Sequence, residues 1–338
     1  MNTMRAVDTA GPMAQDISVG VLLPIGKAQW GGSDPRELVA FASRAERLGY
    51  DSLWVNDGIT EARIEALTML AAAAPVTERV TLGTAALMPV LRRPVQAAQA
   101  LASLDLLSGG RLALTVGAGF PGRFGKPIYE LSGVPWANRF TRLDETVSLW
   151  RQLWSGSENT SFHGEVLHFD GLPPVATPSR PEGPPIWLAG STPAALDRTG
   201  RMYDGWLPYP PRPADYETAL ADVRRATEAA GRPAHAVTPA LFASVLVAPD
   251  VAAGRRTLQE FCLANYRLPL DEVERIQAVA TGTAEQVAAR LAEYTAAGAR
   301  HLVLRLGATD LPSARDQLER IASDVLPRLR EPSPPGLP

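Results

Sequence analysis

Polar residues that could do chemistry follow a short predicted strand near the amino end of the chain. Asn56, Asp57 and Gly58 come directly after the apolar run Leu53–Val55. Asp-Gly is a common hairpin turn, but a helical pattern follows here in place of a second strand, which argues against a hairpin. Asn56 and Asp57 are therefore candidate catalytic or ligand-binding groups at a strand end. In the alternative interpretation, Asp57 only caps a loop or helix.

Three other strand ends carry small residues instead of ionisable ones. These segments are 83–86 (GTAA), 117–119 (GAG) and 189–192 (AGST). Small residues allow a flat, bulky ligand to lie against the backbone. The third segment precedes Pro193, so it is typical of a helix amino end, where free N–H groups and the helix dipole favour a phosphate. Helix capping without a ligand is the alternative.

Residues for metal or nucleophilic catalysis are missing from the predicted strand ends. None of the four histidines, His163, His168, His235 and His301, lies at such an end, and Cys262 is the one cysteine. The sequence contains no P-loop, no Gly-x-Ser-x-Gly elbow and no Rossmann fingerprint. We therefore expect no metal site, and we assign the chemistry to an organic cofactor.

Strand and helix patterns alternate along the chain. The predicted strands are 17–24, 51–55, 79–87, 111–119, 184–190, 204–209, 240–249 and 301–307. The predicted helices are 34–49, 61–74, 94–107, 138–154, 193–201, 214–230, 283–298 and 312–329. Eight strand–helix units predict a single (β/α)8 TIM-like barrel, with a doubly wound open sheet as the alternative.

Three segments exceed a bare barrel and are predicted to form insertions over its C-terminal face, where barrel enzymes hold their active sites. They are 120–137, 155–183, which contains a hairpin-like stretch, and 250–282, which has a helical pattern. The barrel domain is predicted to span 16–330, between disordered tails at 1–15 and 331–338.

Composition restricts the partners and the compartment. The net charge of −3 gives no support for nucleic-acid binding. No apolar run approaches the length of a membrane span, and the first fifteen residues do not resemble a signal peptide. With a single cysteine, a reducing cytoplasmic setting is expected.

The segment RVTLGTAALMPVLRRPVQAAQALASLDLLSGGRLALTVGAG (79–119) resembles the bacterial luciferase-like superfamily of flavin- and F420-dependent oxidoreductases. The segments RAERLGYDSLWVND, PPIWLAGSTPAALDRTGRMYDGW and GTAEQVAARLAEYTAAGARHLVL fit the same family in the same order. The resemblance implies a TIM-like barrel, usually a homodimer, that binds FMN or coenzyme F420 at its C-terminal face.

The resemblance also implies site residues. A non-proline cis peptide after the third strand maps to Ala85–Ala86, and the phosphate loop maps to Gly190, Ser191 and Thr192. The implied cofactor contacts are Asp57, Thr84, Ala85, Ala86, Gly117, Ala118, Gly119, Ala189, Gly190, Ser191 and Thr192. The candidate substrate-pocket residues are Gly58, Phe120, Trp136, Trp206 and Tyr266, and core packing is the alternative for Trp206.

Two positions depart from the family pattern. Gly58 stands where related F420 enzymes often carry a catalytic His, and Phe120 stands where sugar-phosphate dehydrogenases carry a Glu. Alcohol or sugar-phosphate dehydrogenation is therefore not favoured. Because Gly58 stands where related enzymes often keep a catalytic histidine, we expect Gly58→His to change reactivity more than stability.

The Gly117-Ala118-Gly119 loop is more usual among F420 users than the Gly-Arg-Gly of FMN users, so F420 is favoured over FMN. The favoured reaction is hydride transfer to an activated C=C or C=N bond. One alternative is a reduced-FMN monooxygenase that inserts oxygen from O2 and is served by a flavin reductase. The other is a non-catalytic paralogue that binds flavin or another ligand.

Overall fold

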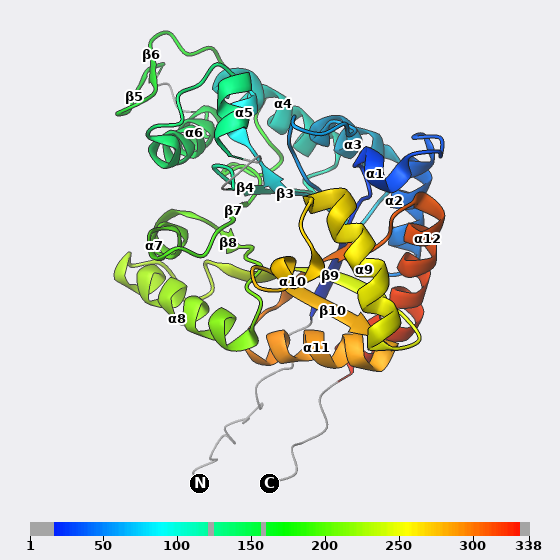
Figure 1. The fold of residues 1–338 in the computed structure, drawn as a ribbon. Coiled ribbons are helices and arrows are strands. Elements are labelled where there is room, and N and C mark those ends of the chain that lie inside the picture. Colours follow the sequence, from blue (N-terminus) through cyan, green and yellow to red (C-terminus); the bar gives the residue numbers. More distant parts are fainter. Residues whose placement is uncertain (1–16, 121–124, 157–159, 332–338) are drawn as a thin grey trace, which may run out of the picture.

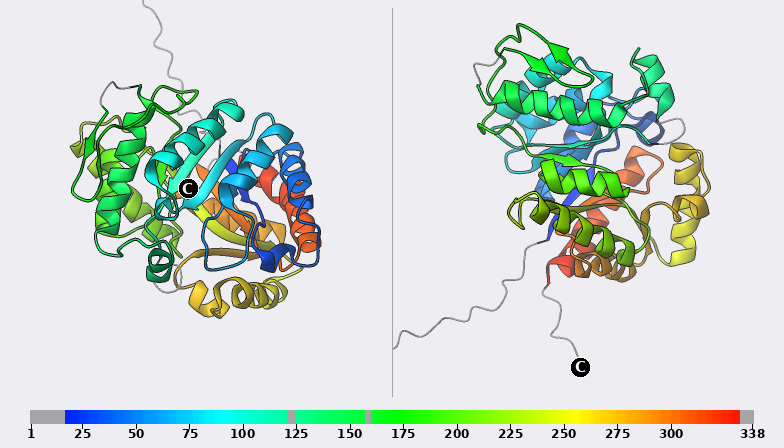
Figure 2. Two further views of the ribbon diagram at one scale, coloured as in Figure 1. Left: turned by 90° about the horizontal axis from the view of Figure 1, so that it is seen from above. Right: turned by 90° about the vertical axis from the view of Figure 1, so that its left-hand side faces the viewer.

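The computed structural model describes residues 17–120, 125–156 and 160–331 (Figures 1 and 2). Both predicted tails, 1–15 and 331–338, lie outside these ranges except for Glu331. Within the described ranges, eight parallel strands pair in the order β11-β1-β2-β3-β4-β7-β8-β9, and the pairing of β9 with β11 closes the ring. The predicted barrel is confirmed, and the open-sheet alternative is wrong.

Each barrel strand is short and buried. The strands are β1 (Ser18–Leu22), β2 (Ser52–Val55), β3 (Thr81–Leu87), β4 (Leu112–Val116), β7 (Ile186–Leu188), β8 (Gly205–Trp206), β9 (Thr238–Val247) and β11 (His301–Leu306). The main outer helices are α2 (Glu37–Arg47), α3 (Ala66–Ala73), α4 (Pro94–Leu107), α6 (Arg139–Trp154), α7 (Pro193–Met202), α8 (Pro213–Ala229), α11 (Ala284–Ala296) and α12 (Leu311–Arg320). A π-helical turn (Ile321–Val325) and α13 (Leu326–Arg330) continue α12, so the last predicted helix, 312–329, is present with a π-helical turn in its middle.

Shorter helices accompany the connections between these elements. They are α1 (Lys27–Trp30), the 3-10 turns η1 (Ala74–Val76) and η2 (Pro89–Leu91), and α5 (Lys126–Leu131). Proline occupies the first turn of α4, α7, α8 and both 3-10 turns, where its missing N–H is no loss to the helix.

The insertions are built differently from one another. The second contains the predicted hairpin, with β5 (Phe162–His163) antiparallel to β6 (His168–Phe169). The third contains α9 (Val251–Tyr266) and α10 (Leu270–Val273), but it ends in a strand, β10 (Ala278–Gly282), that the helical prediction missed. β10 pairs with the second half of β9, whose first residues pair with β8. The sheet therefore has nine strands, and the ninth widens the barrel at its carboxyl end.

Two tryptophans fill the barrel interior. The Trp54 and Trp187 rings lie 5.1 Å apart and are almost completely buried, together with Leu22, Ala113 and Val303. Glycines make room for them, because a Cβ at Gly83 would lie 2.2 Å from the Trp54 ring. The barrel is thus a packed core below its carboxyl end, as expected for this fold.

His301 lies at the amino end of β11, inside the barrel and edge-on to both tryptophan rings. Its Nε2 is 2.8 Å from the Ser52 hydroxyl oxygen. Burial disfavours the charged imidazolium and lowers the pKa of His301 to about 4. This histidine is therefore neutral at physiological pH and is part of the core, far from the carboxyl ends of the strands.

The depressed pKa of His301 predicts an acid-sensitive fold. The unfolded chain takes up the proton near pH 6.5, whereas the folded chain resists it down to about pH 4. Stability from this group is therefore complete above pH 6.5 and is lost as the pH falls, by about 2 kcal/mol between pH 7 and pH 5. Urea unfolding at both pH values measures the loss. In His301→Gln the difference should shrink by that amount, and an unchanged difference would contradict the assignment.

Candidate functional site

The carboxyl ends of β3, β4 and β7 form one continuous backbone surface. The Ala85–Ala86 peptide is cis, which confirms the predicted position, and it lies in an irregular stretch of the β3–β4 register between Thr84 and Leu87. Thr84 is fully buried, and its hydroxyl donates a hydrogen bond of 2.9 Å to the Thr115 carbonyl. The buried threonine anchors the exposed edge of the bulge.

Gly117 lies in the middle of this surface. A Cβ built at Gly117 would lie 3.7 Å from Ala86 Cβ and 3.9 Å from Ala189 Cβ, which is ordinary van der Waals contact. Residues 86, 117 and 189 therefore come from three adjacent strands and leave a shallow area without large side chains. We call Ala85, Ala86, Gly117 and Ala189 the platform. Such an area fits a flat ring system, as the sequence predicted.

The neighbouring loop has the geometry expected of an anion site. Gly190 has a positive φ of 123°, and the exposed Ser191 and Thr192 lead into α7. The Thr192 side chain accepts a hydrogen bond of 3.3 Å from the Ala195 N–H, so capping occurs at Thr192, and Pro193 begins the helix. The exposed helix amino end beside the platform remains a prediction as a phosphate site.

Trp206 does not line a pocket, contrary to its place among the candidate substrate residues. Its side chain is fully buried and packs against Tyr216, with ring centroids 5.1 Å apart. The indole N–H donates a hydrogen bond of 2.8 Å to the Gly190 carbonyl. Trp206 therefore supports the loop from below, because β8 turns this residue toward the outer core.

Asp57 is held in a network of hydrogen bonds. Its Oδ2 accepts from the Met88 N–H at 3.0 Å and from Arg92 Nη1 at 2.6 Å, and its Oδ1 accepts from the Gly58 N–H at 3.0 Å. The carboxylate is nearly inaccessible, with a side-chain exposure of 3%. Asp57 thus fixes the segment that follows the cis peptide after β3. Asn56, the residue before Asp57, is half-buried.

Arg92 was not among the predicted site residues. Burial disfavours its charge, but the hydrogen bonds that Arg92 donates to Asp57 and Glu65 outweigh this and raise the pKa of Arg92 above its ordinary value. The Arg-Arg-Pro stretch before α4 was the available signal, but sequence alone could not pair it with a carboxylate thirty-five residues away. An ion pair at this place ties the end of β2 to the loop after β3.

Gly58 has backbone geometry that a side chain would strain. Its φ is +153°, a conformation that is almost confined to glycine. A Cβ would meet only the Arg63 guanidinium, at 3.7 Å, so space is not the obstacle. The structure therefore adds a stability cost to Gly58→His that the sequence did not indicate, because the backbone itself disfavours the substitution.

Aromatic residues form a wall at the barrel mouth. The Phe120 ring is 42% exposed and lies 6.3 Å from the Tyr209 ring. Burial, followed by the neighbouring Tyr266, raises the pKa of Tyr209 to about 12, so Tyr209 is a neutral phenol. Phe120, a predicted pocket residue, thus lies beside Tyr209, which the sequence analysis did not identify, and Tyr266 is close enough to Tyr209 to affect its ionisation.

Arg305 is a buried cation behind this wall. Its Nη1 donates to the Tyr266 hydroxyl at 2.7 Å and its Nη2 to the Asn265 side-chain oxygen at 3.0 Å. Alternation along β11 places Arg305 on the same side of the strand as His301. A charged residue near the end of an otherwise apolar strand was the sequence signal that could have identified Arg305 as part of the site. This cluster fixes the position of Tyr266.

Trp136, the remaining predicted pocket residue, lies outside the barrel mouth. Its ring meets Tyr129 edge-on at 4.9 Å, and the Arg139 guanidinium carbon lies 4.1 Å above it. Tyr129 in turn donates a hydrogen bond of 3.0 Å to the Ala118 carbonyl, beside Gly119. Trp136 therefore packs on the outer side of the loop after β4.

Over residues 17–120, 125–156 and 160–331, no group of three or more His, Cys, Asp or Glu side chains is arranged to hold a metal ion. Among the helices in the same part of the chain, none combines the length and apolar character that a membrane crossing needs.

Comparisons with known proteins agree with this geometry. A family model described as luciferase-like monooxygenase matches residues 17–301. The F420-dependent glucose-6-phosphate dehydrogenase of Amycolatopsis mediterranei is 31% identical, over 88% of this chain and 95% of its own. An F420-dependent secondary alcohol dehydrogenase, solved with an F420-acetone adduct, superposes with a TM-score of 0.79 at 19% identity, over 94% of this chain and all of its own.

A solved monooxygenase shares the fold as well. RslO1 from Streptomyces bottropensis superposes with a TM-score of 0.76 at 21% identity, over 92% of this chain and 99% of its own. The same barrel is therefore found in proteins named for F420 chemistry and in proteins named for oxygenation.

Proposed function

The chain belongs to the luciferase-like monooxygenase family, and from this premise we propose that it is an oxidoreductase that uses coenzyme F420. The observation that carries the proposal is the platform. Three strands leave an area free of large side chains beside an exposed helix amino end, and the cis peptide lies within it. Its named relative in Amycolatopsis mediterranei supports F420 over FMN.

We propose hydride transfer to an activated C=C or C=N bond as the reaction. Gly58 and Phe120 replace the ionisable residues that the family resemblance leads one to expect after β2 and β4. The backbone of Gly58 disfavours a catalytic side chain there, and Phe120 offers only an apolar ring. Oxidation of an alcohol needs a base to take the hydroxyl proton, which these two positions do not supply. Reduction of an activated double bond takes up one proton as well as the hydride, but solvent can supply that proton, so no positioned base is required.

The residues of the site would bind and orient the reactants. When bound, the cofactor supplies or accepts a hydride at its ring. The platform would support one face of that ring, with Ser191 and Thr192 near its phosphate. Phe120, Tyr209 and Tyr266 would form the facing wall, which excludes water from the reacting atoms. Asp57 acts through Arg92 and the Met88 N–H by fixing the segment next to the cis peptide.

A reduced-FMN monooxygenase, served by a flavin reductase, is the second candidate function. The fold it shares with a solved monooxygenase favours it, and the platform fits an isoalloxazine as well as a deazaflavin. A paralogue that binds ligand without turnover would share the same contacts. For either enzyme we propose a homodimer, as the family resemblance suggests.

The deciding experiment is a fluorescence titration of the protein with oxidised and reduced F420 and with oxidised and reduced FMN. We expect F420 to bind at micromolar concentration or below and FMN to bind more weakly. Preferential binding of FMN would replace the proposal by the monooxygenase. Binding of F420 without oxidation of its reduced form by any enone or imine substrate would favour the paralogue. If none of the four bound, both enzyme proposals would fail.

A further inference from the structure

Tyr209 carries a hydroxyl group that the fold does not use. Its carbonyl accepts a hydrogen bond of 3.0 Å from the N–H of Ala278, the first residue of β10, so the segment after β8 places Tyr209 beside this strand. In the part of the chain that the structure describes, the Tyr209 hydroxyl has no hydrogen-bond partner, and it is not sealed from solvent. Because the phenol is neutral, with a pKa of about 12, its hydroxyl is available as a hydrogen-bond donor at physiological pH.

Tyr266 presents a second hydroxyl, whose oxygen already accepts hydrogen bonds. Arg305 Nη1 donates to this oxygen at 2.7 Å, and Gln277 Nε2 donates to it at 3.2 Å. The Gln277 side-chain oxygen lies 3.4 Å away, which is too far for a good hydrogen bond from the phenol. The proton of Tyr266 is therefore left for an acceptor outside this cluster.

Arg305 gives this part of the barrel mouth a positive charge. The residue is only 8% exposed, and among residues 17–120, 125–156 and 160–331 it forms no ion pair with a carboxylate. Its guanidinium carbon lies 4.7 Å from the centroid of the Tyr266 ring. The carboxyl end of α9, which ends at Tyr266, supplies partial negative charge but no full counter-charge. A buried cation in this state stabilises negative charge that develops on a ligand beside it.

The tyrosine pair and the platform border the same space. β11, which carries Arg305, is four strands from β4 in either direction around the ring of eight, so these two strands lie across the barrel from each other. Gly117 of the platform directly follows β4, and the ring of Phe120, three residues later, lies 6.3 Å from the Tyr209 ring. A substrate that lies over a ring on the platform would therefore be within reach of the two hydroxyls.

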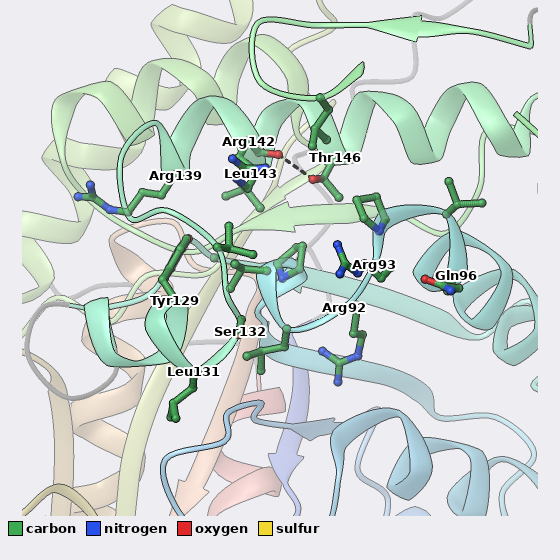
Figure 3. Close-up of a pocket in the computed structure, with 18 of the residues that line it drawn as sticks. Arg92, Arg93, Gln96, Tyr129, Leu131, Ser132, Arg139, Arg142, Leu143 and Thr146 are labelled. Carbon is green, nitrogen blue, oxygen red and sulfur yellow. Dashed lines mark hydrogen bonds between the residues drawn. The ribbon is translucent and has the colours of Figure 1, made fainter. Parts of the chain in front are cut away.

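The arginines near the platform lie in a different place. Gly117 is part of the lining of a cavity of about 670 Å³, and Figure 3 shows Arg142 of α6 across this cavity from Arg92. Neither Tyr209 nor Tyr266 belongs to its lining. The tyrosine pair is thus a separate part of the mouth, with two hydroxyl donors and one buried cation behind them.

We infer that the hydroxyls of Tyr209 and Tyr266 form an oxyanion site, and that the substrate is a conjugated carbonyl compound. The inference rests on the proposed function and narrows its substrate class. Addition of a hydride to the β-carbon shifts the π electrons of the C=C bond toward the carbonyl group, whose oxygen takes the negative charge of an enolate. The two hydroxyls donate hydrogen bonds to this oxygen, and the α-carbon then takes up a proton from solvent. The substrate gains two electrons, and the reduced cofactor that donates the hydride loses them.

A C=N substrate fits this site less well. Its nitrogen must receive a proton, and a phenol with a pKa of about 12 gives up a proton reluctantly, although it donates a hydrogen bond readily. A carbonyl oxygen requires only hydrogen bonds, which strengthen as its charge develops. The site therefore favours a C=C bond conjugated with C=O over an imine.

The test uses 4-nitrophenol, whose anion resembles an enolate, and 4-nitroanisole, a neutral molecule of similar shape. Absorbance titration of the full chain without cofactor measures both the binding and the ionisation of the bound phenol. We expect bound 4-nitrophenol to ionise at a lower pH than the free compound, because the two hydroxyls and Arg305 favour the anion. Tyr209→Phe should weaken binding of the anion at least about tenfold. It should not change the affinity for 4-nitroanisole or the unfolding temperature, because this hydroxyl has no partner in the fold.

Turnover with reduced F420 tests the choice of substrate. Tyr209→Phe should lower kcat for 2-cyclohexenone about hundredfold, and it should lower kcat for 1-pyrroline, a cyclic imine, much less. Tyr266→Phe should act in the same direction. Its unfolding temperature is measured as well, because loss of this hydroxyl also removes a hydrogen-bond acceptor from Arg305. Equal losses on the enone and the imine would overturn the preference for a carbonyl compound.

Tyr50→Phe is the matched control, since the Tyr50 hydroxyl donates to the Leu318 carbonyl between the outer helices α2 and α12. It removes one hydroxyl and should leave the affinity and ionisation of 4-nitrophenol unchanged. If 4-nitrophenol failed to bind, if it ionised at the same pH bound and free, or if Tyr209→Phe bound its anion as tightly as the unchanged protein, the oxyanion site would be wrong while F420 dependence stood. Failure of F420 to bind in the separate cofactor titration would instead remove the proposed function and leave the phenol result in place.

Discussion

Gly117→Val is expected to weaken cofactor binding more than a hundredfold while leaving the unfolding temperature within a few degrees of the unchanged protein. The Cβ of residue 117 meets only the methyl groups of Ala86 and Ala189, at ordinary contact distances, so the fold tolerates it. The two Cγ atoms would then extend over the platform, where a flat ring must approach the backbone. A hundredfold loss corresponds to about 2.7 kcal/mol, well within the cost of displacing a ring from its contact surface.

Fluorescence titration and thermal unfolding measure the two effects separately. Gly117→Ala is the graded control, because its methyl group fills the space between Ala86 and Ala189 and should cost much less affinity. Equal affinity of the valine variant and the unchanged protein would show that the ring does not lie on the platform. A large fall in unfolding temperature would show that the surface is part of the core.

Gly83→Ala is expected to destabilise the barrel by about 3 kcal/mol or more, at the upper end of the range for overpacked cores. Its Cβ would lie 2.2 Å from the Trp54 ring, a separation that only movement of a fully buried indole could relieve. Trp54 has little freedom to move, because Trp187 lies 5.1 Å away and the Trp54 N–H donates to Ser52. Urea unfolding of the purified variant measures the loss.

The double variant Gly83→Ala/Trp54→Leu should recover part of the lost stability, because the smaller side chain frees the space that the methyl group needs. If the change in the free energy of unfolding of the double variant is smaller than the sum of the two single changes, the clash between residues 83 and 54 is the cause. Gly26→Ala serves as a control, since a Cβ there has an ordinary neighbour at 3.7 Å and φ is −73°. If Gly83→Ala were as stable as this control, the tight packing of Trp54 against β3 would be refuted.

The alternation of strands and helices allowed the barrel to be predicted from sequence. Apolar runs such as 301–307 and helix starts such as Pro193 are local signals, and local signals carry most of the strand order in a fold whose consecutive units are neighbours. The same reasoning missed β10, because Ala278–Gly282 is short and rich in small residues. Its place in the sheet depends on the exposed edge of β9, which is a tertiary feature.

The candidate site, too, could be predicted only in part from the sequence. The cis peptide and the loop 189–192 were located through family motifs, which depend on backbone geometry. The side-chain partners were not located, since the Asp57–Arg92 pair and the Arg305–Tyr266 contact join residues far apart in the sequence. Trp206 shows the converse difficulty, as a two-residue strand gives too little alternation to tell an inward from an outward side chain.

β10 has a consequence for the passage of ligands. It pairs with β9 along its whole length, so the wall segment from α9 to β10, which carries Tyr266 at the end of α9, is joined to the sheet at its carboxyl end by backbone hydrogen bonds. Swinging that wall aside would break several of these bonds at once, each worth about 1 kcal/mol. A slow release step in turnover is therefore not expected from an outward movement of this wall.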